Sequence, residues 1–101
     1  MDVQIKTDKD TLYVIPHGFI DEYTAHDLRR AMDAAADQYP QTVVLDFGDV
    51  DFMDSTGIGT ILARYKVMRD RNIELCVKNV NKQVDKVFRL TGIYSILNVA
   101  R

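Results

Sequence analysis

The feature that most constrains the fold is a short apolar run followed by a glycine-containing segment near the middle of the chain. The run is Thr42-Val43-Val44-Leu45, and it lacks the alternation of polar and apolar residues that a half-exposed strand shows. It is therefore typical of a central parallel strand that is covered on both faces. The segment DFMDSTGIG, residues 51–59, follows, and a helical pattern of apolar residues starts within it, so we expect a helix to begin at Ser55. A buried strand that leads into a helix indicates an α/β fold.

The rest of the chain alternates in the same way after an N-terminal pair of strands. Two short alternating segments joined by a polar turn predict an antiparallel β-hairpin. The expected elements are strands at 3–7 and 11–15, a helix at 25–38, a strand at 42–45, a helix from 55 to 69–71, a strand at 73–77, a helix bounded by Asn81 and Gly92, and an apolar tail at 93–99 that docks on the core. This order predicts a mixed sheet of four to five strands with the N-terminal β-hairpin at one side and helices mainly on one face.

The helix ends carry recognisable capping residues. Thr24 precedes the first helix and Asp27 follows three residues later, a spacing that resembles a capping box. Asn81 is a good N-cap for the last helix, and Gly92 is placed to end it. These signals predict where the helices begin and end.

The composition sets limits on function. The 101 residues are 47% hydrophobic and 28% charged, with a formal net charge of -2, which is typical of one soluble globular domain over residues 1–101. This charge argues against nucleic-acid binding and against a polybasic membrane anchor. No apolar run reaches the length of a membrane span and no signal-peptide pattern opens the chain, so we expect a monomeric cytoplasmic protein. The lone Cys76 is expected to be a small buried core residue.

Ser55 is the residue with the clearest potential for regulation. A serine at a helix start can simply cap the helix. Gly57 and Gly59 would each cost the helix about 1 kcal/mol relative to alanine, so they need a reason; one is that another protein approaches the backbone there and leaves the hydroxyl open. On the same helix, one face carries small or weakly apolar residues, which predicts an exposed docking strip: Thr56, Thr60, Ala63 and Val67.

Other chemistry finds less support in the residues. The acidic segment from Asp46 to Asp54 is expected to be a solvated loop, with a weak metal site or a phospho-acceptor at Asp46 as alternatives. Gly57 and Gly59 do not complete a dinucleotide motif, no P-loop is present, and Ser55 is not in a G-x-S-x-G elbow. We therefore expect no catalytic residues, no metal and no cofactor.

Three segments resemble the STAS domain family, and within it the bacterial anti-sigma factor antagonists. They are GFIDEYTA at 18–25, VLDF at 44–47 with VDFMDSTGIG at 50–59, and VFRLTGI at 87–93. The D-S-x-G-x-G core is a specific signal where it follows an apolar strand. The resemblance covers almost the whole chain and implies the mixed-sheet STAS fold.

The resemblance also implies a partner-switching regulator. The unphosphorylated protein would bind an anti-sigma factor, a serine kinase of the GHKL type, and so release a sigma factor for transcription. The kinase would phosphorylate Ser55 and end the complex, and a PP2C-type phosphatase would reset it. Asp21 would assist kinase contact or loop structure, and Asp54 would position the serine loop. With the small-residue face, this predicts the following partner-binding residues: Asp21, Asp54, Ser55, Thr56, Gly57, Gly59, Thr60 and Ala63.

Several alternatives stay open at this stage. The chain could be a phosphorylation-independent STAS scaffold of a lipid-transport or stress-sensing complex, or a partner-switch regulator whose output is not a sigma factor. The enzymatic alternative is a small serine hydrolase that uses Ser55. Thr56 next to Ser55 could be a second phosphate acceptor.

Overall fold

The computed structural model describes residues 1–100. A central sheet of five strands has the order β1-β2-β4-β6-β7, in which only β1 and β2 are antiparallel. A second, two-stranded parallel sheet is formed by β3 and β5. The strands are β1 (Val3–Asp8), β2 (Thr11–Pro16), β3 (Gly18–Ile20), β4 (Thr42–Asp46), β5 (Val50–Met53), β6 (Glu74–Lys78) and β7 (Asn98–Val99). The helices are α1 (Ala25–Ala36), α2 (Ser55–Asp70), α3 (Lys82–Thr91) and the 3₁₀ turn η1 (Ile93–Ser95). The mixed sheet and its hairpin are as predicted from the sequence.

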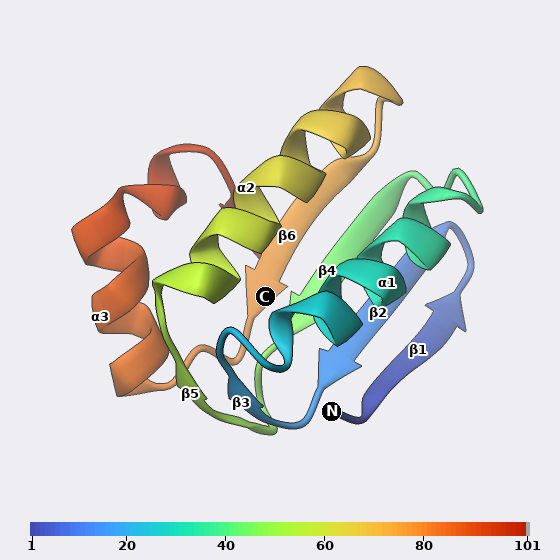
Figure 1. Ribbon diagram of the computed structural model, residues 1–101. Coiled ribbons are helices and arrows are strands. Elements are labelled where there is room, and N and C mark those ends of the chain that lie inside the picture. Colours follow the sequence, from blue (N-terminus) through green and yellow to red (C-terminus); the bar gives the residue numbers. More distant parts are fainter. Residues whose placement is uncertain (101) are drawn as a thin grey trace.

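Helices α1 and α2 lie side by side across one face of the central sheet, and α3 lies beside them next to β5 (Figure 1). Each helix buries one stripe against the sheet, as the 3.6-residue spacing of its apolar residues requires. The fully covered side chains of this layer include Leu28, Met32, Ile61 and Met68. The prediction of helices mainly on one face is confirmed.

Two ion pairs join α1 to α2. Arg64 Nη1 lies 2.6 Å from Asp33 Oδ1, and Arg71 Nη1 lies 2.8 Å from Asp37 Oδ1. Both pairs connect residues more than thirty positions apart in the sequence. They link the middle and the C-terminal end of α2 to α1 and to the residue that follows it.

The segment from Asp46 to Asp54 is not the loop that was predicted. Its second half is β5, which pairs in parallel with β3 so that Phe19 lies opposite Phe52 and Ile20 opposite Met53. The strand was missed because its four residues are buried only at the two ends, a pattern that does not alternate.

The capping box at the start of α1 is also absent. The Thr24 side chain makes no capping bond; its hydroxyl donates to Phe19 O at 2.7 Å instead. Asp27 Oδ2 accepts from the Met1 ammonium group at 3.0 Å rather than from the helix backbone. This ammonium group lowers the pKa of Asp27, through the hydrogen bond first and its charge second. The two side chains were compatible with a box by spacing, but both have partners outside the first turn.

The C-terminal part follows the sequence prediction closely. Asn81 Oδ1 accepts from Val84 N at 2.9 Å and caps α3, and Gly92 ends it with a φ of 73°. Beyond it, Ile93 and Leu97 are buried and β7 pairs with β6. The apolar tail therefore docks on the core and adds the fifth strand.

Candidate functional site

Ser55 is the first residue of α2, and its neighbour Asp54 is the N-cap. Asp54 has an extended backbone, and its Oδ1 accepts from Thr56 N at 2.9 Å. The reading of Ser55 as a possible cap is therefore wrong, because the capping position is already filled. Ser55 is exposed, and within residues 1–100 its hydroxyl makes no side-chain hydrogen bond. Because this hydroxyl makes no stabilising hydrogen bond within these residues, its modification would break none.

Asp21 is brought to the same end of the molecule by the pairing of β3 with β5. Asp54 N donates to Ile20 O at 3.1 Å, so the residue after Ile20 lies next to the serine loop. Asp21 Oδ1 accepts from the backbone N–H groups of Tyr23 and Thr24 at 2.9 and 3.1 Å. This carboxylate shapes its own turn with one oxygen, and the side chain is half-buried.

The two glycines of α2 have different roles. A Cβ atom on Gly57 would lie 2.8 Å from both Ile20 Cγ2 and Met53 Cγ. Gly57 is buried, and its missing side chain makes room for the two-stranded sheet of the protein itself, which explains this glycine without a partner. Gly59 is exposed, and nothing lies within 4 Å of its Cβ position. Of the two glycines, Gly59 alone leaves the helix backbone open to the approach of another protein. A partner contact at Gly57 stays a prediction.

The predicted docking face of α2 is open to solvent at its N-terminal half. We define the small-residue strip as Ser55, Thr56, Gly59, Thr60 and Ala63, which lie on one helical face. Thr60 is half-buried and the other four are exposed, and Val67 farther along is half-buried. The opposite stripe is the core stripe of Ile58, Ile61 and Met68. A flat strip of small residues allows a partner to approach the helix closely.

The chain segment that leads into the strip is acidic. Residues 31–63 contain six aspartates and no lysine, arginine or histidine. The positive end of the α2 dipole favours an anion at Ser55.

The remaining acidic candidate, Asp46, is held by one backbone and one side-chain hydrogen bond. Asp46 Oδ1 accepts from Gly48 N at 2.9 Å and from Asn79 Nδ2 at 3.0 Å. Among residues 1–100, no group of three or more His, Cys, Asp or Glu side chains is placed to hold a metal ion. Asp46 shapes the turn after β4, which explains the residue without a phospho-acceptor role.

Two features near Ser55 were not predicted from the sequence. Phe19 and Phe52 form an exposed ring pair with centroids 5.8 Å apart, and they are 55% and 38% exposed. On the other edge of β5, the side-chain amide of Gln83 bonds the backbone of Met53 at both its N–H and its C=O, each at 2.9 Å. The ring pair depends on the pairing of β3 with β5, which the sequence pattern did not reveal.

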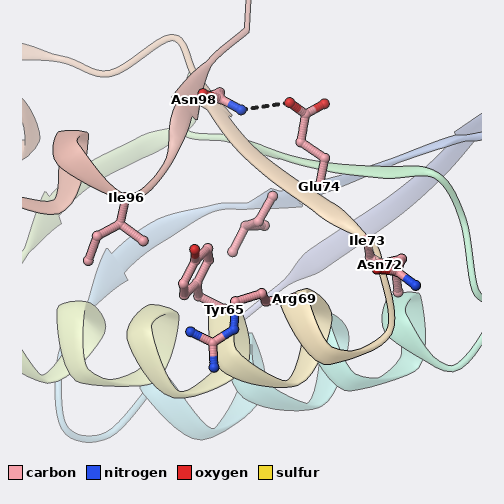
Figure 2. Close-up of a pocket in the computed structure, with 8 residues that line it drawn as sticks. Tyr65, Arg69, Asn72, Ile73, Glu74, Ile96 and Asn98 are labelled. Carbon is pink, nitrogen blue, oxygen red and sulfur yellow. Dashed lines mark hydrogen bonds between the residues drawn. The ribbon is translucent and has the colours of Figure 1, made fainter.

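The cavities lie elsewhere on α2. Figure 2 shows one of about 300 Å³ between the second half of α2, the start of β6 and the C-terminal segment, where Asn98 Nδ2 donates to Glu74 Oε2 at 2.6 Å. A neighbouring hollow of about 500 Å³ shares Tyr65, Arg69 and Ile96 with it. Ten residues of helix, about 15 Å, separate Tyr65 from Ser55. Ser55 lines neither of these two hollows.

Comparison with known proteins gives the family. The family model described as "STAS domain" matches residues 2–101. The chain belongs to the STAS family. This STAS domain is 29% identical to the anti-sigma F factor antagonist of Paenibacillus polymyxa over 98% of the chain and 86% of that protein. It is also 29% identical to the anti-sigma-B factor antagonist of Listeria monocytogenes, over 96% of the chain and 86% of the relative.

Solved structures agree on the fold. The unphosphorylated form of the anti-sigma factor antagonist SpoIIAA superposes on this STAS domain with a TM-score of 0.82 at 24% identity, covering 99% of this chain and 89% of that one. The phosphorylated form of the Bacillus protein SpoIIAA gives a TM-score of 0.74 at 22% identity, covering 99% and 92%. At this identity the likeness establishes the mixed-sheet architecture. Within the described residues, no helix of the STAS domain has the length and apolar character to span a membrane.

Proposed function

We propose that this STAS domain is an anti-sigma factor antagonist whose binding to its partner is switched by phosphorylation of Ser55. One observation carries the proposal: Ser55 is exposed at the start of α2, beside a strip of small residues, while Asp54 does the capping. The names of the two relatives support the role, since both are antagonists of factors that act on a sigma factor. Such proteins are regulators rather than enzymes.

The partner that we propose is an anti-sigma factor with serine kinase activity of the GHKL type. In the unphosphorylated state, the small-residue strip lets this protein pack closely on α2 and keeps it from the sigma factor. The kinase then transfers a phosphate from ATP to Ser55, and a PP2C-type phosphatase removes it. A cycle that uses ATP and a sigma factor belongs in the cytoplasm.

Electrostatics explains why the phosphate ends the complex. A phosphoserine carries a charge of about -2 at neutral pH, and packing a partner over it removes its water. At ~4 Å and an effective dielectric of ~20, one pair of like unit charges costs up to ~4 kcal/mol. Because ~1.4 kcal/mol is a tenfold change in affinity, half of that cost weakens binding by more than tenfold. The fold itself tolerates the anion, since the start of α2 favours negative charge.

The first experiment tests the site of phosphorylation. The wild-type chain and Ser55→Ala are incubated with the cognate kinase and ATP, and phosphate incorporation is measured by mass spectrometry. We expect one phosphate on the wild type and none on Ser55→Ala. Thr56→Ala tests whether the neighbouring hydroxyl accepts the phosphate instead. This variant should incorporate as much phosphate as the wild type. Undiminished phosphate on Ser55→Ala would overturn the assignment.

The second experiment tests the switch. Ser55→Asp should weaken binding to the unmodified kinase by at least about tenfold in calorimetry. Ser95→Asp adds the same charge at the other serine of the chain, which is exposed and lies in η1 away from the strip. Because the Ser95 hydroxyl donates to Gly92 O at 2.7 Å, urea unfolding checks that this control variant is folded. Equal partner affinity for the wild type and Ser55→Asp would instead indicate a phosphorylation-independent scaffold.

A further inference from the structure

The outer edge of β5 is paired by side chains and not by another strand. β3 pairs with the inner edge of β5. On the opposite edge, Gln83 Oε1 accepts from Met53 N and Gln83 Nε2 donates to Met53 O, both at 2.9 Å. A carboxamide offers one acceptor and a donor in the same arrangement as a peptide group. Gln83 therefore takes the place of a third strand at Met53.

Asn81, two residues before Gln83, ties the same two elements together. Its Oδ1 caps α3 by accepting from Val84 N at 2.9 Å, and its Nδ2 donates to Val50 O at 2.8 Å. The N-terminal end of α3 thus holds β5 at its first and last residues. A two-stranded sheet is only marginally stable by itself. The side-chain amides of Asn81 and Gln83 therefore add to the stabilisation that β5 receives from β3.

Met53 is the last strand residue before the serine loop. Its side chain is fully buried and lies against Gly57, and the next residue, Asp54, is bonded through its N–H to Ile20 O at 3.1 Å. The backbone that enters Ser55 is therefore fixed by β3 on one side and by Gln83 on the other. Removal of Gln83 would release one of these two sides.

We propose that Gln83 is a positioning residue for Ser55: its double hydrogen bond to Met53 sets the backbone from which the serine hydroxyl is presented to a kinase. Gln83 does not touch the hydroxyl and acts through Met53 and Asp54. The expected effect on phosphorylation rests on the proposed function. The double hydrogen bond between Gln83 and Met53 can be tested on the isolated chain.

The first test measures hydrogen exchange of backbone amides by NMR. Gln83→Leu removes both hydrogen bonds at similar size, and Gln83→Glu keeps the acceptor but loses the donor. We expect exchange at the Met53 amide to be about tenfold faster in Gln83→Leu, with a smaller change in Gln83→Glu. Amides of the core, such as those of Ile61 and Val77, should keep their rates. Gln4→Leu, the same change at an exposed glutamine of β1, should leave Met53 unchanged.

The second test measures phosphorylation by the kinase that modifies the wild-type chain. We expect kcat/KM for Ser55 to fall by about tenfold in Gln83→Leu, less in Gln83→Glu, and not at all in Gln4→Leu. A wild-type kcat/KM for Gln83→Leu would overturn the inference and leave the proposed function intact. Faster exchange at Ile61 and Val77 together with Met53 would also overturn it, because the role would then be general stability. A wild-type chain that accepts no phosphate would overturn the proposed function and this inference with it.

Discussion

Gly57 lies so close to Met53 that a Cβ atom on the glycine would come within 2.8 Å of the Met53 Cγ atom. Met53 is fully buried, so it has little room to move away. The contact joins the first turn of α2 to β5, and it places the helix start directly on the strand that precedes it. The same spacing explains why a glycine stands inside a helix, where its backbone freedom is a disadvantage.

Gly57→Ala should therefore destabilise the protein, whereas Gly59→Ala should not. The added methyl group at residue 57 would collide with Ile20 and Met53, and overpacking of this kind costs about 1–3 kcal/mol. At the open position 59, alanine is the better helix former by up to about 1 kcal/mol. Urea unfolding of both variants measures the difference. Equal unfolding midpoints would contradict the packing role of Gly57.

Asp54→Ala should lower stability by about 1 kcal/mol, because it removes the side chain that caps α2. Asp54→Asn should stay close to the wild type, since an asparagine oxygen can accept the same bond from Thr56 N. Asp51→Ala removes an exposed carboxylate three residues earlier, on β5, and controls for the change in charge. Urea midpoints that fall equally for Asp51→Ala and Asp54→Ala would show that charge, and not capping, is responsible.

The sequence alone was sufficient where a pattern is local and long. The apolar stripes of α1 and α2, the hairpin, and the end signals Asn81 and Gly92 each depend on neighbours in the chain. Periodicity over three or more turns therefore predicted the helices that cover the sheet.

The sequence was insufficient where the outcome depends on distant partners. β5 is short, and β3, which pairs with it, lies about thirty residues earlier. Asp54 and Ser55 are both good capping residues, and the extended backbone of Asp54 decided between them. The role of Gln83 depends on where α3 meets β5, so no local pattern could reveal it. The sequence shows that Gly57 is unfavourable in a helix, but the side chains that require a glycine there come from two strands, β3 and β5.

Cys76 should react slowly with thiol reagents in the folded protein. Burial raises the pKa of its thiol to about 11, with a further contribution from the charge of Glu74. At about pH 8 the reactive thiolate is therefore scarce, and the side chain is almost fully covered. A disulfide-exchange dye should titrate one thiol rapidly in urea and only slowly in buffer. Equal rates in both would show that β6 opens readily at this residue.

Asp85 and Tyr94 should give the stability a dependence on pH at both ends of the scale. Tyr94 OH donates to Asp85 Oδ1 at 2.7 Å, and Arg89 Nε donates to Asp85 Oδ2 at 2.7 Å. The hydrogen bond from Arg89, and then that from Tyr94, lower the pKa of Asp85. Its carboxylate therefore stabilises the fold above the unfolded-state pKa of about 4, and this contribution is lost as the pH falls through the lower folded-state value.

In the alkaline range, the stability of the fold changes with pH in the opposite direction. Burial, and then the hydrogen bond to Asp85, raise the pKa of Tyr94 to about 12. The unfolded chain loses this proton near pH 10, at about the ordinary pKa of a tyrosine, so stability should fall as the pH rises from there toward the folded-state value. Tyr94→Phe should abolish the alkaline loss, and Asp85→Asn should reduce the acidic one, to which Asp27 also contributes. Urea midpoints measured across pH test both variants, and an alkaline loss that survives in Tyr94→Phe would assign it to another group.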